Sequence, residues 1–496
     1  MTALEILRLR TRRLTPHPVA DDGAYVLCWL MQALRAEENP VIDAAIALGD
    51  RLGLPVVVLQ TLENRYPYAS ARIHRFMLEA SQELADGVEA RGLRFARYVR
   101  TGPPGGDAPG AIEAAAGLAQ RAAAVLVDDV PTFVTREYAD ALAGALDRAV
   151  LAVDACCAVP MNAFAEPVAT TKGFRAAHTP LRALHLGTEL RQEPEHGRYE
   201  GALALPPSPD VQGLDGDALD AVIARCGVDP SVPPVPAWNG ARSAALARLR
   251  AAVEAVVPGY KWTRNNPALP DASSRLSPWL HFGVLSPREV ARAVLDAEAA
   301  GRVHAAARWK FLDETLTWRE VSHHRCRWEP DWARFEGLPA WAQQTLRAHA
   351  DDPRPALYSL DALAHGETDD ETWNAAQKQF TLDGWMNNNL RMYWVKQILK
   401  WRPTPEDAFA TACYLNDRFS LDGRDAATYG GIRWGFGEAK RGYRELAVYG
   451  WVAPKGSGAL RKRDGVPAWL AAQAAREVPV RATIAADPPP EFDRYR

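Results

Sequence analysis

Cysteine is scarce in this chain, and long apolar runs are absent. The six cysteines among 496 residues include no CxxC pair, so a disulfide framework is disfavoured and a reducing cytosol fits. No apolar run reaches the roughly 18–20 residues of a membrane-spanning helix. The opening residues 1–16 are basic but lead into no apolar signal-peptide core. We therefore expect a cytoplasmic protein with no membrane partner.

The chain also lacks a charge bias and the common nucleotide-binding motifs. Charged residues make up 24% and the net charge is −3, values that point to no polyanionic or membrane partner. A local basic surface can still exist under that average. Neither GxGxxG nor GxxxxGK followed by Ser or Thr comes after an apolar run of strand type, so a dinucleotide site or P-loop of the common kind is not indicated.

Tryptophan is nearly absent from the first half of the chain and abundant in the second. Of the 16 tryptophans, only Trp29 precedes residue 238. Because tryptophan is large and costly to place, this richness indicates a region that binds something flat or moves electrons. The alternative is that a large helical domain uses these rings as core filler.

The first 160 residues alternate between two kinds of pattern. Short apolar runs, several of them rich in valine, suit buried parallel strands, and helical patterns lie between them. This alternation predicts a doubly wound α/β domain with a parallel sheet. The predicted strands are residues 24–30, 54–62, 94–100 and 123–130, and the predicted helices are residues 40–52, 70–92 and 108–122.

The composition changes after this domain. Pro, Gly and Asp gather in residues 202–217 and 228–240, which is typical of a linker. Beyond residue 240 the patterns are almost all helical, and a chain of this length favours two or three domains. We predict an α/β domain over residues 1–160, a linker over 161–240, an all-helical domain over 241–475 and a loose tail over 476–496.

Small hydroxyl residues precede a predicted helix in residues 264–287. Ser273, Ser274 and Ser277 stand just before the turn, where hydroxyls and backbone N–H groups can bind a phosphate. An ordinary N-cap and loop explains the same composition equally well.

A carboxylate and an indole share a helix face in residues 311–324. Glu314 and Trp318 are four residues apart, so together they could bind a planar polar ligand. An exposed acid over a core tryptophan is the more common explanation of such a pair. The nearby His323, His324 and Cys326 have no second paired motif, so no metal site is predicted.

Two further segments combine charge with aromatic or glycine residues. In residues 387–401, Trp394 and Trp401 are seven apart and point to the same side of a helix, and Arg391 precedes them. Residues 415–437 carry repeated Asp and Gly at a spacing that misses the EF-hand pattern. Their carboxylates have Arg391 as a possible partner.

Several of these stretches together resemble a known family. "RNNP", "SSRLSPWLHFGVLS", "FLDETLTWRE", "WNAAQ", "LRMYWVKQILKW" and "LNDRFSLDGRDAATYGGIRW" are similar to the successive signatures of class II cyclobutane pyrimidine dimer photolyases. They run in family order from Tyr260 to Trp434, and the amino-terminal "CWLMQALRAEENP" and "ARIHRFMLEASQEL" are also similar. The resemblance covers most of the chain and is specific for the photolyase–cryptochrome superfamily.

The resemblance implies a light-driven DNA-repair lyase that contains FAD. In the family, excited reduced flavin gives one electron to a pyrimidine dimer, the cyclobutane ring splits and the electron returns. The expected partner is UV-damaged DNA, and a deazaflavin-type antenna chromophore is an option in the first domain. We expect a monomer without a metal.

Residue matching assigns expected roles around the flavin. Arg391 would pair with Asp422 and help to hold the negative charge of the reduced ring, because a carboxylate keeps such a cation in place. Asn416 matches the residue that faces flavin N5. The other expected cofactor contacts are Tyr260, Ser274, Leu276, Ser277 and Gly423.

The same matching assigns the substrate contacts. Glu314 would hydrogen-bond the dimer and steady the negative charge that develops on it. Trp318 and Trp434 would flank the flipped-out dimer, with Met392 beside them, because flipping enzymes stack an extruded base on aromatic surfaces.

The resemblance also implies an electron relay of three indoles. The family counterpart of Trp394 lies beside the flavin, that of Trp373 is next, and that of Trp401 is near the surface. Indole can be oxidised transiently, so such a row would reload an oxidised flavin.

The chain departs from the class II pattern at four positions. Members usually carry a "GKMHGYMRM"-like sequence, whereas this chain has "DGWMNNNLRM". Trp385 thus replaces a lysine, Asn387 a histidine and Asn389 an aromatic residue, and Lys440 stands where an aspartate is expected. These departures lie near the expected flavin-facing and DNA-facing surfaces.

An alternative function is a cryptochrome-like blue-light receptor that keeps FAD and the tryptophan row but has little repair activity. Glu314, Trp318 and Trp434 favour repair, because a receptor need not keep contacts to a dimer. An iron–sulfur relative is disfavoured, since only Cys326 and Cys413 lie in the helical region.

Overall fold

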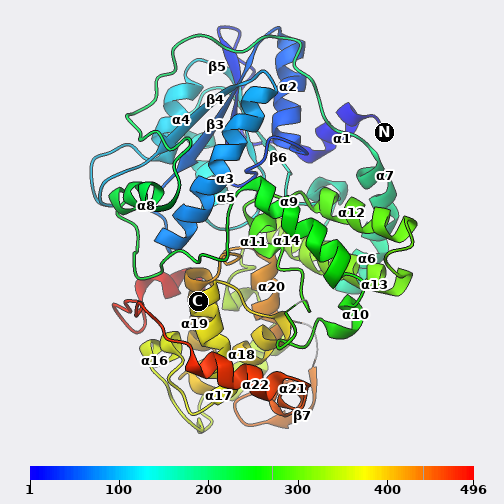
Figure 1. The fold of residues 1–496 in the computed structure, drawn as a ribbon, viewed down its shortest axis with the longest axis vertical. Helices are drawn as coiled ribbons and strands as arrows, with labels where there is room; N and C mark the ends of the chain where they lie inside the picture. Colours follow the sequence, from blue (N-terminus) through cyan, green and yellow to red (C-terminus); the bar gives the residue numbers. More distant parts are fainter. Residues whose placement is uncertain (271, 439–440) are drawn as a thin grey trace.

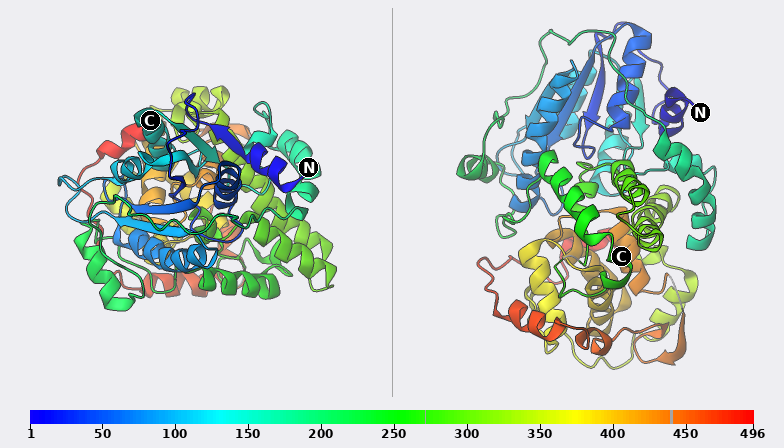
Figure 2. Two further views of the ribbon diagram at one scale, coloured as in Figure 1. Left: turned by 90° about the horizontal axis from the view of Figure 1, so that it is seen from above. Right: turned by 45° about the vertical axis from the view of Figure 1, so that its right-hand side comes forward.

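The chain folds into an α/β domain and a helical domain, which lie one above the other in Figure 1. The computed structural model describes residues 1–270, 272–438 and 441–496. Within these residues, no helix combines the length and apolarity that crossing a bilayer requires. Rotated views show the helical domain packed against one end of the sheet (Figure 2).

The first domain is built on a six-stranded sheet with the order β1-β6-β5-β2-β3-β4. All neighbouring strands are parallel except β1, which pairs antiparallel with β6. The central strands are buried on both faces, as their continuous apolar runs predict. The four predicted strands are present, and β1 and β6 are additional. The strands are β1 (Thr11–Arg13), β2 (Tyr25–Leu30), β3 (Val56–Leu62), β4 (Arg94–Val99), β5 (Ala122–Asp128) and β6 (Ala149–Val153).

Helices cover both faces of this sheet, so the doubly wound α/β prediction is confirmed. Helix α2 shows why its boundaries fall where they do. Asn39 caps its N-terminus, Pro40 occupies the first turn, and Gly53 ends it in the left-handed region at a φ of 69°. The helices of this domain are α1 (Ala3–Arg10), α2 (Pro40–Leu52), α3 (Ala71–Ala90), α4 (Ala111–Ala119) and α5 (Phe133–Ala145).

The predicted linker over residues 161–240 contains short helices of its own. From α7 the chain passes over the outside of the α/β domain to reach α8 on the opposite side (Figure 1). This segment also returns to the helical domain, where the start of α6 lies beside η4 (Asp313–Trp318) and α14 (Arg319–Trp328). Its elements are η1 (Met161–Ala163), α6 (Thr171–His178), η2 (Thr179–Leu181), α7 (Arg182–Gly187) and α8 (Gly216–Arg225).

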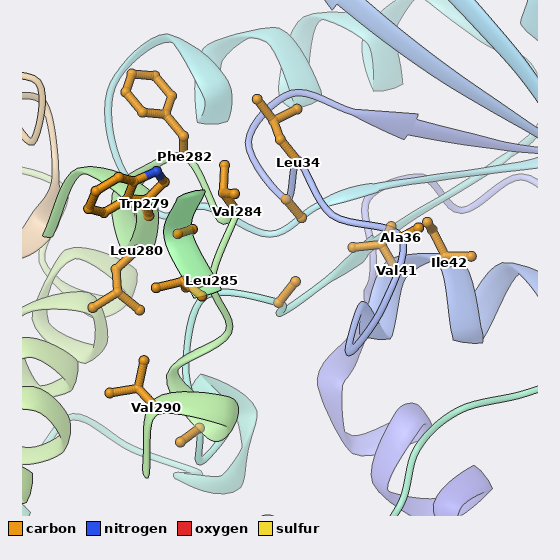
Figure 3. Close-up of a cluster of buried hydrophobic side chains, with 14 of the residues drawn as sticks. Leu34, Ala36, Val41, Ile42, Trp279, Leu280, Phe282, Val284, Leu285 and Val290 are labelled. Atoms are coloured by element: carbon orange, nitrogen blue, oxygen red, sulfur yellow. The ribbon is translucent and has the colours of Figure 1, made fainter. Parts of the chain in front are cut away.

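The two domains share one apolar core. Figure 3 shows Leu34 of the α/β domain near Phe282 and Val284 of the helical domain. The backbone N–H of Leu34 donates to the Phe282 carbonyl at 3.1 Å. Gly283 has a φ of 64°, and a Cβ there would meet the Ala33 Cα at 2.8 Å, so only glycine allows this approach. The buried contact fixes the two domains against each other.

The helical domain packs around a second apolar core formed mainly by α17, α18, α19 and α20. Two of its helices contain π-helical segments, η3 (Ala252–Val256) and η4 (Asp313–Trp318), and such segments are frequent at functional sites. The other helices are α9 (Arg242–Ala251), α10 (Tyr260–Thr263), α11 (Ser277–His281), α12 (Pro287–Ala299), α13 (Ala305–Leu312), α14 (Arg319–Trp328), η5 (Phe335–Gly337), α15 (Ala340–Ala348), α16 (Leu360–His365), α17 (Glu371–Asp383), α18 (Asn388–Trp401), α19 (Pro405–Phe419) and α20 (Ala426–Gly435).

The C-terminal segment differs from the loose tail that we predicted over residues 476–496. Phe492 and Tyr495 are fully buried, and the Tyr495 hydroxyl donates to Asp417 Oδ2 at 2.7 Å. The prediction missed these contacts because a few scattered aromatic residues give no periodic signal. This segment contains η6 (Pro490–Arg494). The domain over residues 241–475 ends in α21 (Gly458–Arg461) and α22 (Val466–Ala475), and it is not all-helical as predicted, because β7 (Arg441–Leu446) and β8 (Gly450–Val452) form a two-stranded antiparallel sheet within it.

Candidate functional site

A cavity of about 220 Å³ lies within the helical domain, between the loop before α11 and the helices α18 and α20. Six of the eight predicted cofactor residues line it: Tyr260, Ser274, Leu276, Ser277, Arg391 and Asp422. The remaining two predicted contacts, Asn416 and Gly423, lie behind this lining. We call this space the inner cavity.

A buried ion pair forms part of the wall of the inner cavity. The Arg391 Nη2 lies 3.1 Å from Asp422 Oδ1, and both side chains are less than a tenth exposed. Burial alone would raise the pKa of Asp422, but the Arg391 charge and hydrogen bonds from Ser420 and Ser277 outweigh it, so the pKa is lowered. The carboxylate therefore stays ionised and holds the cation at the cavity wall.

Asn416 supports this ion pair from behind. Its Oδ1 accepts from Arg391 Nη1 at 3.4 Å, and its Nδ2 donates to Asp417 Oδ1 at 2.8 Å. Asn416 and Asp417 are both fully buried. At Gly423 an added Cβ would meet the Asn416 carbonyl oxygen at 2.6 Å, so this glycine allows the close approach of two backbone segments.

The serine loop offers donors for an anion. Ser273, Ser274 and Ser277 all line the inner cavity, and Arg275 lies between them in the left-handed region at a φ of 55°. Its buried Nε has no hydrogen-bond partner among the described residues, and its guanidinium lies 5.0 Å from the centre of the Trp385 ring. Hydroxyls beside an unsatisfied guanidinium N–H suit a phosphate. These donors, with Arg391 on another part of the wall, fit the phosphate and ring portions of FAD.

A larger cavity of about 720 Å³ adjoins the inner one, and we call it the outer cavity. Trp318 and Trp434 line it with exposed fractions of 39% and 37%, and Met392 lies in the same wall. The two cavities share the residues Glu314, Arg319, Asn388, Ala427 and Gly431. All four predicted substrate contacts therefore meet at this surface.

Glu314 lies at the junction of the cavities but already has two cationic partners. Its Oε1 is 3.1 Å from Arg264 Nη1 and 2.5 Å from Lys310 Nζ. Both cations also line the outer cavity. The π-helical segment Asp313–Trp318 contains Glu314 and Trp318, and both side chains reach the outer cavity, as their spacing of four residues predicts.

Sequence reasoning missed several charged residues of this site. Lys310 precedes Glu314 by four residues, a spacing that could have revealed the pair. Arg264, Arg319 and Lys172 gave no comparable signal. Lys172 and its neighbours Ala169, Thr170 and Thr171 belong to the predicted linker, yet they line the outer cavity.

The three predicted relay tryptophans lie in contact. The rings of Trp373 and Trp394 are stacked with centres 6.1 Å apart at 3°, and those of Trp373 and Trp401 are 5.5 Å apart at 76°. The Trp373 Nε1 donates to the Trp394 carbonyl at 3.0 Å, which fixes the stack. Trp401 is only 5% exposed, so it is more buried than the near-surface position that we expected.

One aromatic ring separates Trp394, the first of the three tryptophans, from the wall of the inner cavity. None of the three tryptophans lines that cavity. The Phe380 ring bridges the gap, because its centre is 5.7 Å from Trp394 and 5.3 Å from the Arg391 guanidinium.

Two of the four departures from the class II pattern line the cavities. Trp385 lines the inner cavity, where Arg275 lies over its ring. Asn389 lines the outer cavity, and Asn387 caps α18. Lys440 lies outside the described residues.

A third cavity, of about 70 Å³, lies between the domains. It opens at the carboxyl ends of β2 and β3, where ligands of doubly wound sheets commonly bind. Phe133 and Arg424 line it in the left-handed region at φ values of 56° and 65°, and such strain clusters at ligand sites. Its aromatic lining consists of Tyr66, Phe133, Tyr138, His281 and Phe282.

The fold is similar to that of solved photolyase and cryptochrome structures. A class III photolyase from Agrobacterium tumefaciens superposes with a TM-score of 0.62 at 18% identity, over 90% of this chain and 86% of that one. A cryptochrome from Synechocystis gives a TM-score of 0.63 at 15% identity, over 90% and 87%. At these identities the likeness concerns the fold alone.

Sequence comparison identifies the family. Residues 26–186 match the family described as DNA photolyase. The deoxyribodipyrimidine photo-lyase of Methanothermobacter thermautotrophicus is 30% identical over 441 residues, which are 89% of this chain and 92% of that protein. The chain therefore belongs to the DNA photolyase family, within the photolyase and cryptochrome superfamily.

Proposed function

We propose that this protein is a class II photolyase that repairs cyclobutane pyrimidine dimers in DNA with light. Bound reduced FAD, once excited, would supply the electron that splits the dimer. The observation that supports this most is the junction of two cavities, one with donors suited to the cofactor and one flanked by exposed tryptophans. A planar lesion in the outer cavity would then lie next to the cofactor in the inner cavity.

The inner cavity has the charges that this proposal needs. Arg391 is held by Asp422 and offers a fixed cation against an anionic ring. The serine hydroxyls and Arg275 would bind the phosphates at another part of the wall. All of these donors are held in place before the cofactor binds. Binding therefore costs little side-chain conformational entropy.

The lining of the outer cavity supports the binding of an extruded dimer. Trp318 and Trp434 present aromatic surfaces to the outer cavity, where an extruded base could stack on them. Glu314 can accept a hydrogen bond from the base edge, while its partners Arg264 and Lys310 bring positive charge beside it. That charge would favour both the DNA backbone and the dimer anion.

The cavity between the domains is our candidate for an antenna site. Its aromatic lining suits a planar chromophore of the deazaflavin type, although such a molecule enters only if the lining side chains move apart. His281 lines this cavity and Asp425 lines the inner cavity, and their side chains meet at 3.1 Å. A chromophore there would lie close to the flavin, as light transfer requires.

The decisive experiment combines the absorption spectrum of the purified protein with an assay for repair of dimer-containing DNA. Purified protein should show flavin absorption, and it should restore dimer-containing DNA under blue light but not in the dark. Asp422→Ala is the control, because stranding the buried Arg391 costs about 3–5 kcal/mol and should release the flavin. Dimers that persist in light with fully reduced flavin present would contradict the proposal.

One outcome of this assay would favour the cryptochrome-like alternative. A protein that binds FAD and photoreduces it, yet leaves dimers intact, would be a receptor with an intact tryptophan row. Trp318 and Trp434 favour repair because both line the outer cavity with Glu314, and a receptor need not keep such a set of lesion contacts.

A further inference from the structure

Asp417 is a fully buried carboxylate that lies beside Asn416, behind the wall of the inner cavity. The described residues give it four hydrogen-bond donors. Its Oδ1 accepts from Asn416 Nδ2 and from the Arg424 backbone N–H, both at 2.8 Å. Its Oδ2 accepts from the Tyr429 hydroxyl at 2.6 Å and from the Tyr495 hydroxyl at 2.7 Å. A carboxylate has about four acceptor sites, so this set of donors fills them.

Tyr495 differs from the other three donors in its place along the chain. Those three lie within 12 residues of Asp417, whereas Tyr495 lies 78 residues away and follows η6. Burial, together with the nearby Asp417 charge, raises the pKa of the Tyr495 hydroxyl well above its usual value. The hydroxyl therefore keeps its proton and acts as a donor to the carboxylate.

The C-terminal segment that carries Tyr495 is docked by further contacts. Phe492 is fully buried, and its ring centre lies 5.9 Å from that of Tyr414. The Phe335 backbone N–H donates to the Tyr495 carbonyl at 2.8 Å. The segment therefore presents the Tyr495 hydroxyl to Asp417 from a backbone that is itself held in place.

Asp417 also decides which end of the Asn416 amide points toward the inner cavity. The Asn416 Nδ2 donates to the carboxylate, so its Oδ1 is left to accept from Arg391 Nη1 at 3.4 Å. The same Nδ2 lies 3.3 Å from Oγ1 of Thr428, which lines the inner cavity. A reversed amide would turn its oxygen toward the carboxylate and its NH₂ toward the guanidinium, and both contacts would be repulsive.

We propose that Tyr495 is a positioning residue for the FAD site. It holds Asp417 in the place from which that carboxylate orients the Asn416 amide, and the amide in turn supports Arg391 at the cavity wall. This inference rests on the FAD binding proposed above. Docking of the C-terminal segment and binding of FAD are then coupled, so each favours the other by the same factor.

The first test compares two chemically matched substitutions. Tyr495→Phe removes the hydroxyl that donates to Asp417 and keeps the ring. Tyr393→Phe makes the same change at another buried tyrosine of this core, whose hydroxyl donates to Asp370. Both variants should have a lower melting temperature without FAD. Only Tyr495→Phe should raise the FAD dissociation constant, by about tenfold, which lies within the usual range for coupled sites.

Two further measurements separate positioning from a purely structural role. The midpoint potential of bound FAD should fall in Tyr495→Phe, because Arg391 is held less firmly against the anionic reduced ring, and it should stay unchanged in Tyr393→Phe. Tyr429→Phe removes the other Oδ2 donor and leaves the C-terminal contacts in place. It should also raise the FAD dissociation constant, because the coupling runs through Asp417.

Hydrogen exchange tests the coupling in the wild type, without any substitution. The backbone N–H groups of Tyr495 and Arg496 donate to the Phe492 carbonyl at 3.0 and 3.1 Å, so they report on the docked segment. Addition of FAD should slow their exchange about tenfold, the same factor as for the dissociation constant.

The contrary results are distinct. If the wild type binds no FAD, the proposed function fails and this inference fails with it. If the wild type binds FAD but Tyr495→Phe matches Tyr393→Phe in dissociation constant and midpoint potential, Tyr495 is only structural and the FAD site stands. Equal exchange of the C-terminal N–H groups with and without FAD would overturn the inference even where a variant does not fold.

Discussion

Two groups of tryptophans in one domain occupy opposite environments. Trp373 and Trp394, on α17 and α18, are fully buried and stacked, whereas Trp318 and Trp434 are 39% and 37% exposed at the outer cavity. The same indole can fill a core, pass an electron or stack on a base. Burial and neighbouring groups, rather than residue type, therefore decide which of these roles a tryptophan can take.

The two groups of tryptophans should differ most in their contribution to the free energy of unfolding. Trp373→Ala opens a cavity in the core and should lower the free energy of unfolding by about 3–5 kcal/mol. Trp434→Ala removes an exposed ring and should change it by less than about 1 kcal/mol. Chemical denaturation of both variants measures the contrast, and equal losses would break the comparison.

For binding of a dimer-containing duplex, the exposed tryptophans should contribute more than the buried ones. Trp434→Ala should weaken binding of a dimer-containing duplex by about 1–3 kcal/mol, the usual worth of one base stacked on an aromatic ring. Binding of undamaged duplex should change much less. A titration that shows the same loss for both duplexes would remove Trp434 from the lesion site.

Phenylalanine substitutions test the electron role of the buried row. Trp373→Phe and Trp401→Phe keep much of the packing, but phenylalanine is far harder to oxidise. Photoreduction of oxidised flavin should slow roughly tenfold or more, which corresponds to about 1.4 kcal/mol in an activation barrier. Repair with chemically reduced flavin should be unchanged, because it does not use the row.

Normal photoreduction in both of these phenylalanine variants would show that the buried rings are only core filler. Flash photolysis resolves the rate directly. The flavin content of each variant serves as the control for packing.

The smallest expected effect is on the pH dependence of stability and concerns Lys396. This residue shares α18 with the buried Trp394 and lies near the ring of the exposed Trp434. It belongs to α18, it is 2% exposed, and its Nζ lies 5.8 Å from the centre of the Trp434 ring. Burial, with a smaller contribution from Lys455, lowers the pKa of Lys396 to about 7. In the unfolded chain the amine has a pKa of about 10.4.

Between these two pKa values the unfolded state binds more protons, so the stability of the folded protein should rise as the pH increases from 7 towards 10. Lys396→Met removes this titration. We expect the variant to be roughly 1 kcal/mol more stable at pH 7 and to show a flatter stability profile. Melting curves across this range check the slope, and parallel profiles would show that Lys396 does not titrate there.

Much of the fold follows from local patterns. The valine-rich runs of the sheet are buried on both faces, and the helix over residues 40–52 has its cap, its proline and its terminal glycine in sequence. Strand β1 escaped prediction because it is an edge strand of three residues, TRR, with no apolar signal, and β6 escaped it because its apolar run, AVLAV, is only five residues long. The buried C-terminal segment escaped it because its docking depends on partners such as Asp417, 78 residues away from Tyr495.

The family signatures, the expected cofactor and substrate residues and the spacing that brings Glu314 and Trp318 to one surface could all be obtained from the sequence alone. The tertiary structure alone brought the Tyr495 hydroxyl to Asp417, beside Asn416. It also paired Glu314 with Arg264 and brought Lys172 to the outer cavity. The reason is physical: the partners of a carboxylate or a cation come from distant segments, and only folding brings those groups within hydrogen-bonding distance.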